Sequence, residues 1–388
     1  MQETTLPTSH LLVLNEEQEL LKSSARDFFK EKSPVSALRT LRDTRNEKGF
    51  DPQLWQQMAE MGWAGMVIPE AYGGLDFGYL GMGIVLEEAA RTLIASPLIS
   101  TALVSATALR LGGSEAQKER FLPDIAEGNL LMSLALEEGK HHNPLKISTE
   151  ARQEGSYFIL NGSKTFVIDG HIADQFIIAA RSSQKPGDSQ GISLFVVDAQ
   201  AEGLQIRRTI SLDSRNYADI QIQGLKVSAD ALLGELGQGY ELLQTVLDIS
   251  NIHLAAELSG LMQEAFERTM AYLKERKQFG VPIGSFQGLQ HRAADLYCHI
   301  EMCQSVVRKA LMAIDAQANN LPLLASLAKA KTCETVKRVT NEAIQMFGGI
   351  GVTDDEEIGF FLKRARAVQM TFGDYAYHLD RFASLQGY

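Results

Sequence analysis

An aspartate among aromatic residues near the C-terminus is the first candidate for acid–base chemistry in this chain. In the stretch QMTFGDYAYHLDRF, residues 369–382, Asp374 directly follows Gly373 and shortly precedes His378. A carboxylate held in a dry pocket can act as a general base. An aspartate after a glycine also suits a turn between two helices. The stretch alone leaves both interpretations open.

A second candidate site lies in YLKERKQFGVPIGSFQ, residues 272–287. The planar guanidinium of Arg276 matches the geometry of phosphate oxygens and could clamp a phosphate group. Phe279 could then lie flat against an aromatic ligand. The competing interpretation is an ordinary helix C-terminus, in which basic residues complement the helix dipole and Gly280 and Pro282 end the helix.

A third motif, AIQMFGGIGVT at residues 343–353, places a Gly-Gly-x-Gly turn after a predicted helix. Glycines allow a backbone to approach a ligand closely, but they also serve to end a helix and reverse the chain. The motif is not a dinucleotide-binding fingerprint, because the GxGxxG spacing is absent and no strand precedes it. The GxSxG, HExxH and Walker sequences of hydrolases and NTPases are absent as well.

Composition excludes several other classes of protein. A net charge of -11 provides no basic face for nucleic acid. Neither a disulfide framework nor a zinc site is expected from three cysteines without CxxC spacing (Cys298, Cys303 and Cys333). Adjacent histidines such as His141 and His142 would face opposite ways on a strand, so we expect no metal site there. Without a signal sequence or an apolar run of about 18 residues, the sequence predicts a cytoplasmic protein that does not enter a membrane.

The elements that must position these residues change character twice along the chain. Helical spacing runs from about residue 15 to 128, with Asn15 as a predicted N-cap. Short β-rich runs follow, and SYFILNGSKTFVI predicts a hairpin that turns at Asn161-Gly162. Long helices then return, and we expect four of them at about residues 240–277, 286–317, 322–346 and 355–371.

The predicted fold is therefore mainly α with a central β domain. An N-terminal helical domain (1–129) precedes an antiparallel β sandwich or barrel (130–234), and a C-terminal four-helix bundle (235–388) follows. This order excludes a parallel α/β sheet, which needs alternating strands and helices.

Taken together, the motifs resemble those of the acyl-CoA dehydrogenase family. The resemblance is carried in order by GWAGMVIPEAYGG, LNGSKTFVIDG, ERKQFGVPIGSFQGLQHRAAD and IQMFGGIGVT, and it covers nearly the whole chain. The ending FLKRARAVQMTFGDYAYHLDRF is most similar to the small subunit of pimeloyl-CoA-type and other heteromeric acyl-CoA dehydrogenases. The fold that the resemblance implies is the helical, β and bundle order deduced above.

The resemblance implies an FAD-dependent dehydrogenase that acts on an acyl-CoA thioester and passes electrons to an electron-transfer flavoprotein. In such enzymes a carboxylate removes the α-proton while the β-hydride goes to the flavin. FAD lies across a subunit interface, in a homo-oligomer or hetero-oligomer. The matching FAD positions are Arg276 at the pyrophosphate, Phe279 near the adenine, Gln287, the segment Gln345, Met346, Phe347, Gly348 and Gly349 from a neighbouring subunit, and Phe166 to Ile168 against the flavin ring.

Three positions depart from the family pattern. The usual catalytic glutamate aligns with Gly373, and its alternative position on the long helix aligns with Ser250. In LALEEGKHHNP, residues 134–144, Glu137 replaces a threonine that usually contacts the flavin.

These departures leave three hypotheses. The chain could rely on the catalytic base of a partner subunit. It could be self-sufficient with Asp374 as the base, with a non-CoA substrate included. It could also be a catalytically silent relative that serves as a structural or binding partner. Glu257 and Asp248, on the long helix, are weaker candidates for the base.

Overall fold

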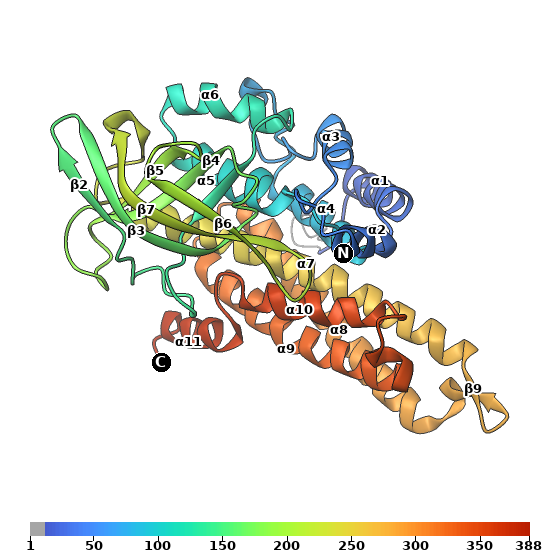
Figure 1. Cartoon of the computed structure of the whole chain (residues 1–388). Coiled ribbons are helices and arrows are strands. Elements are labelled where there is room, and N and C mark those ends of the chain that lie inside the picture. The colour runs from blue at the N-terminus through green and yellow to red at the C-terminus, as the bar shows by residue number, and fades with distance from the viewer. Residues whose placement is uncertain (1–11) are drawn as a thin grey trace, which may run out of the picture.

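The computed structural model describes residues 12–388, and the N-terminal part of that range is helical (Figure 1). Asn15 caps the first helix as expected, because its side chain accepts from Gln18 N while the Gln18 side-chain oxygen accepts from Asn15 N. A π-helical segment at Leu98–Ser105 precedes α5. The α-helices of this region are α1 (Glu16–Lys32), α2 (Val35–Asp43), α3 (Pro52–Glu60), α4 (Tyr79–Arg91), α5 (Ala106–Gly112) and α6 (Glu115–Ala126).

The central region forms one eight-stranded sheet in the order β6-β7-β3-β2-β4-β5-β8, with β1 paired to β4. Most neighbours are antiparallel, as predicted, but β4 runs parallel to β1 and to β2. The strands are β1 (Met132–Ala135), β2 (Glu150–Glu154), β3 (Tyr157–Ile168), β4 (Gln175–Arg181), β5 (Ile192–Asp198), β6 (Leu204–Ile210), β7 (Asn216–Ser228) and β8 (Leu232–Leu233).

The predicted hairpin at Asn161-Gly162 is wrong, because β3 continues through both residues. The chain turns instead before β3, at Gly155, which has φ 63°. Partner strands β2 and β7 flank β3 on both sides and hold it extended, and the pairing of β3 with β7 shifts register between Leu160 and Gly162. A Cβ at Gly162 would lie 2.7 Å from Thr149 Cα, so glycine serves a close approach here rather than a turn.

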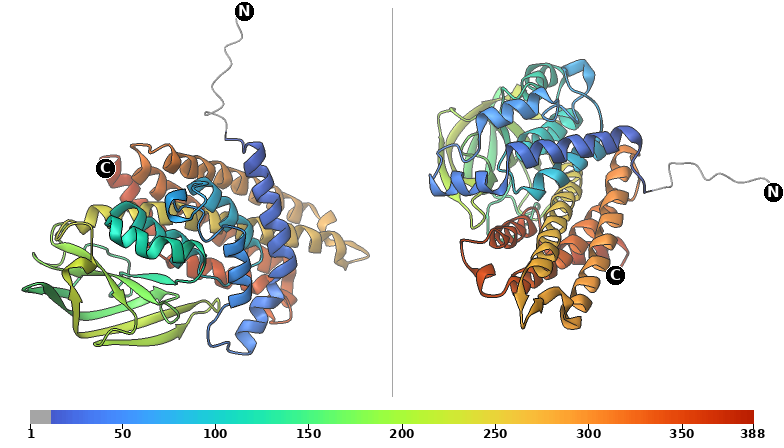
Figure 2. Two further views of the ribbon diagram at one scale, coloured as in Figure 1. Left: turned by 90° about the horizontal axis from the view of Figure 1, so that it is seen from above. Right: turned by 90° about the vertical axis from the view of Figure 1, so that its right-hand side faces the viewer.

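The four long helices expected after the sheet are confirmed as α7 (Gly239–Glu275), α8 (Gln287–Asp315), α9 (Leu321–Phe347) and α10 (Ile358–Met370). A short hairpin of β9 (Lys277–Gln278) and β10 (Val281–Pro282) joins α7 to α8 at the end of the bundle farthest from the sheet (Figure 1). A further helix that the spacing did not predict, α11 (Tyr375–Leu385), follows α10 and packs on α9 near the β domain (Figures 1 and 2).

Two hydrophobic cores hold these regions together. One lies within the β domain, and the other runs from the N-terminal helices through the bundle. The buried Arg364 of α10 ties the regions to one another: its Nε donates to Asp213 Oδ2 at 2.6 Å, and its terminal nitrogens donate to the carbonyls of Leu93 and Ile94. The β domain is therefore fixed against the bundle, which allows a site to form between them.

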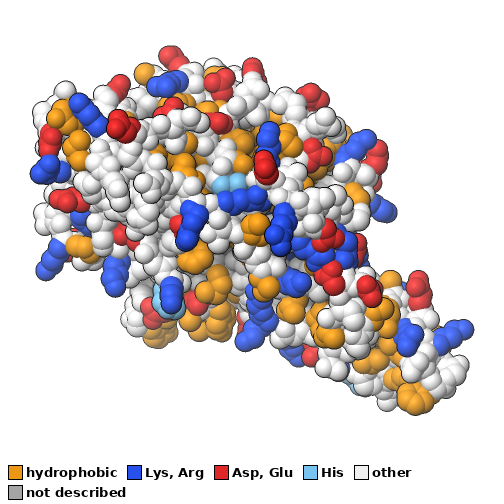
Figure 3. All heavy atoms as spheres, in the orientation of Figure 1, with side chains coloured by type: hydrophobic (Ala, Val, Ile, Leu, Met, Phe, Trp, Pro, Cys, Tyr) orange, Lys and Arg blue, Asp and Glu red, His pale blue; other side chains and the backbone are white. Residues whose placement is uncertain are grey.

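The surface carries both signs of charge. Both acidic and basic side chains are spread over the face seen in Figure 3, and several basic side chains gather near its centre. Within residues 12–388, no helix combines the length and the apolar character that crossing a membrane requires.

Candidate active site

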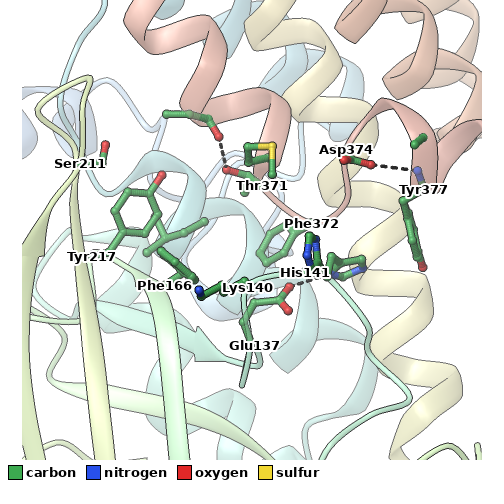
Figure 4. A pocket seen from close by; sticks show the side chains of 16 residues that line it. Glu137, Lys140, His141, Phe166, Ser211, Tyr217, Thr371, Phe372, Asp374 and Tyr377 are labelled. Carbon is green, nitrogen blue, oxygen red and sulfur yellow. Dashed lines mark hydrogen bonds and ion pairs between the residues drawn. The ribbon is translucent and has the colours of Figure 1, made fainter.

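A cavity of about 550 Å³ lies between the β domain and the connection from α10 to α11 (Figure 4). The β-domain wall comes from the loop after β1, from β3 and from the start of β7, and the opposite wall comes from the end of α10 and the start of α11. The lining residues are Glu137, Gly139, Lys140, His141, His142, Phe166, Ile168, Ser211 and Tyr217 on one side and Ala367, Met370, Thr371, Phe372, Asp374, Ala376 and Tyr377 on the other. The predicted site residues Asp374, Phe166 and Ile168 thus border one cavity.

A buried lysine holds the loop between α10 and α11 in place. Lys329 of α9 is fully buried, and its Nζ donates to the carbonyls of Thr371 at 2.5 Å and Gly373 at 3.2 Å. The same ammonium donates to Asn251 Oδ1. Burial lowers the pKa of Lys329. This lysine satisfies carbonyls that the end of α10 leaves open, and so it positions the cavity residues that follow.

Asp374 has a structural function as well as a place at the cavity. It is the N-cap of α11, and its Oδ1 accepts a hydrogen bond from Tyr377 N at 2.9 Å (Figure 4). Its other carboxylate oxygen has no hydrogen-bond partner among residues 12–388. Asp374 therefore caps a helix after a turn, as one interpretation of the sequence predicts, and it borders the cavity, while its action as a base stays a prediction.

Gly373, which the sequence resemblance aligns with the family's usual glutamate, lies in a backbone conformation that disfavours any side chain. Its φ is 104°, which L-residues rarely adopt. A Cβ there would lie 2.5 Å from Tyr377 Cδ1 and 2.8 Å from His378 Nε2. The loop is thus built around glycine.

The long helix offers no replacement base at the cavity. Ser250 is buried, and its hydroxyl donates to Val246 O at 2.6 Å. Glu257 is paired with Arg215, and Asp248 is paired with Arg381. Ser250, Glu257 and Asp248 do not line the cavity.

The loop after β1 contributes two acid pairs that sequence reasoning missed. Glu137 Oε1 lies 2.5 Å from His142 Nδ1 at the cavity wall. Glu138 accepts from Lys164 Nζ at 2.7 Å, and burial lowers the pKa of Lys164. The histidines are in a loop, not on a strand as assumed. The available signal was the spacing of two acids and a histidine around Gly139, which allows the loop to fold back on itself.

The remaining predicted FAD residues form a second group at the other end of the bundle. Arg276 is the C-cap of α7, is exposed and makes no ion pair within residues 12–388. Phe279 is 92% exposed beside the β9–β10 hairpin, and Gln287 begins α8. Tyr272 stacks on Phe347 with ring centroids 4.3 Å apart, which brings the end of α9 to the end of α7.

Within this second group the residues differ in solvent exposure. Met346 and Phe347 are buried in the core, whereas Gln345, Gly348 and Gly349 are exposed. A Cβ at Gly348 or Gly349 would meet no atom within 4 Å, so the backbone is open to a ligand. The single chain therefore holds the cavity residues and the second group apart (Figure 1).

The chemistry of the two groups of residues can be compared with the parts of FAD. An unpaired exposed arginine suits a pyrophosphate, and an exposed aromatic ring beside it suits an adenine. The apolar cavity wall with Phe166, Ile168 and Tyr217 suits the flavin ring. Among residues 12–388, no cluster of three or more metal-ligating side chains is present.

Comparison with known proteins gives the same family over the whole chain. Family models for the N-terminal, middle and C-terminal domains of acyl-CoA dehydrogenase match residues 15–129, 134–224 and 237–384. The caffeyl-CoA reductase-Etf complex subunit CarC of Acetobacterium woodii is 30% identical over 89% of this chain and 92% of its own. Cyclohex-1-ene-1-carbonyl-CoA dehydrogenase of Syntrophus aciditrophicus is 29% identical over 93% of this chain and 87% of its own. The butyryl-CoA dehydrogenase structure from Megasphaera elsdenii superposes with a TM-score of 0.89 at 27% identity, covering 97% and 99% of the two chains.

Proposed function

Because this chain belongs to the acyl-CoA dehydrogenase family of FAD-dependent oxidoreductases, we propose that the cavity of about 550 Å³ is where an acyl-CoA thioester is dehydrogenated between Cα and Cβ. The single observation that carries this assignment is the meeting of Phe166, Ile168 and Asp374 at one apolar cavity. Bound FAD would supply the acceptor for the β-hydride. The residues of the cavity bind and orient the acyl group, exclude water and take up the α-proton.

We propose that a second subunit completes the FAD-binding site. Support comes from the separation of Arg276, Phe279 and Gln345 from the cavity of the same chain, together with their exposure. The subunit that donates them could be a second copy or a related chain.

An electron-transfer flavoprotein is the proposed acceptor, as the name of the Acetobacterium relative suggests. A cytoplasmic location is proposed too, in keeping with three unpaired cysteines.

Asp374 is the base that the sequence favours if the chain is self-sufficient. One oxygen caps α11 and the other is left for a proton. The test uses Asp374→Asn, which retains the cap oxygen and removes the charge. If Asp374 is the base, this variant retains FAD but loses bleaching of the flavin by acyl-CoA. Asp380→Asn, an exposed change on the same helix, is the matched control. Unchanged bleaching in Asp374→Asn contradicts this assignment.

The second candidate function is that of a subunit whose catalytic base comes from a partner. The positive φ of Gly373 and the lack of room for a Cβ there favour it. Under this proposal the purified single chain shows little dehydrogenation of any acyl-CoA, and co-expression with a base-bearing subunit restores it. Robust turnover by the single chain rules the proposal out. A flavin absorption band in the purified protein counts against the silent relative.

A further inference from the structure

The pair formed by Glu137 and His142 is built into the cavity wall. Glu137 Oε1 and His142 Nδ1 are 2.5 Å apart, and the side chains are only 15% and 5% exposed. The backbone around Glu137 is fixed, because Thr165 N donates to its carbonyl at 2.8 Å. The ring of His142 packs edge-on against Tyr377, with centroids 4.8 Å apart and an angle of 83° between the planes. Both members of the pair are therefore held in place.

His142 has one ring nitrogen left for a ligand. When Nδ1–H donates to Glu137, the neutral ring carries its lone pair on Nε2. Nε2 makes no hydrogen bond within residues 12–388, yet it is not sealed off, whereas Nδ1 of His378 is enclosed without a partner. A fixed imidazole with one open nitrogen on a cavity wall has the geometry of a general base.

The groups around this ring include two carboxylates. Glu137 makes direct contact and would stabilise an imidazolium. Asp374 borders the same cavity and adds a second carboxylate. The other titratable groups near the ring are Lys140 and His141 in the same loop and Tyr377 and His378 on α11. Asp374, unlike His142, already uses one oxygen to cap a helix.

We propose that His142, paired with Glu137, accepts the α-proton of the substrate. This inference rests on the proposed dehydrogenation at the same cavity and makes His142 and Asp374 rival proton acceptors. The Cα–H bond of the acyl thioester breaks, its electron pair stays on Cα and delocalises into the thioester carbonyl, and the proton moves to Nε2. Glu137 stabilises the imidazolium that forms. Under this proposal Glu137 does not contact the flavin, as the threonine usual at its position does, but holds the imidazole that acts as the base.

Exchange of the α-proton with solvent tests this step. Enzyme purified with its flavin, and with any co-purifying subunit, is mixed with an acyl-CoA thioester in D₂O, and deuterium at Cα is followed by mass spectrometry. His142→Gln should slow exchange at least about 100-fold while flavin content stays unchanged. His141→Gln alters the neighbouring imidazole but not the pair of Glu137 and His142, so it should slow α-proton exchange much less than His142→Gln does. Imidazole added to His142→Gly should restore exchange, which a purely structural function would not allow.

The outcomes separate this inference from the proposed function. Wild-type-like exchange in His142→Gln, or equal losses in His141→Gln and His142→Gln, overturns the assignment to His142 while leaving dehydrogenation intact. Loss of exchange in Asp374→Asn but not in His142→Gln transfers the step to Asp374. Absence of both exchange and flavin bleaching in the wild type, with and without a co-expressed base-bearing subunit, overturns both proposals.

Discussion

The ammonium of Lys329 donates to the carbonyl of Gly373 at 3.2 Å, although the two residues are 44 positions apart in the chain. A buried cation of α9 thereby closes the end of α10 and holds the loop that carries the cavity residues Phe372 and Asp374. The position of Asp374 is consequently set by a residue of another helix.

Replacing Lys329 should loosen this loop. Lys329→Met leaves the carbonyls of Thr371 and Gly373 without a donor, so we expect unfolding to be easier by about 1–3 kcal/mol. Amide exchange at residues 371–374 should become faster. Lys331→Met is the control, since Lys331 makes only a surface pair with Glu334 and should change stability by less than about 0.5 kcal/mol. Equal stability of the Lys329 and Lys331 variants in denaturant titrations would contradict this function of Lys329.

Introducing the family's glutamate at Gly373 should damage the chain rather than create a base. Gly373→Glu requires a Cβ 2.5 Å from Tyr377 Cδ1 at a φ of 104°. We expect a loss of at least about 2 kcal/mol in unfolding free energy. Gly359→Ala, within α10 and with only an ordinary contact at 3.8 Å, should instead be neutral or stabilising by about 0.5–1 kcal/mol. A stable Gly373→Glu chain with faster α-proton exchange would show that the loop accepts a base there.

Acid should destabilise the protein through His378. Burial first, and then the charge of Lys329, lowers the pKa of His378 to about 2. An unfolded histidine titrates near pH 6.5, so below that pH the unfolded chain binds a proton that the folded chain rejects. Stability is complete above about pH 6.5 and falls toward pH 2, by up to about 1.4 kcal/mol per pH unit.

Unfolding curves measured between pH 7 and pH 4 check this linkage. His378→Gln retains a donor for the Phe372 carbonyl and should show a flatter pH dependence than the wild type. The same substitution at the exposed His291 controls for the loss of one histidine. Parallel pH profiles for the wild type and His378→Gln would refute the linkage.

Arg276 should govern flavin retention without governing the fold. Arg276→Ala removes an exposed side chain that makes no ion pair within the described residues, so the apoprotein should melt like the wild type. Loss of a charged contact to the pyrophosphate should weaken FAD binding by about 10- to 100-fold. Titration of FAD into the apoprotein measures this affinity. Lys274→Ala, an exposed cation on the last turn of α7, is the control, and equal FAD affinity in both variants would remove Arg276 from the cofactor site.

The sequence by itself determined the order of elements, the four long helices and the family. Helices follow from contacts between residues three or four apart, and the N-cap of Asn15 follows from a side chain that reaches three residues along the chain. Such local contacts can be predicted from the spacing of residues along the sequence.

Only the tertiary structure decided where Asn161-Gly162 lies and how the cavity is built. The strands β2 and β7 pair with β3 on its two sides, and this pairing keeps the dipeptide extended where the local sequence predicted a turn. The bond from Lys329 to Gly373 and the packing of His142 on Tyr377 join residues from different elements. Their existence depends on how helices and sheet pack, because burial and long-range distance, unlike helical spacing, leave no repeating signal in a single sequence.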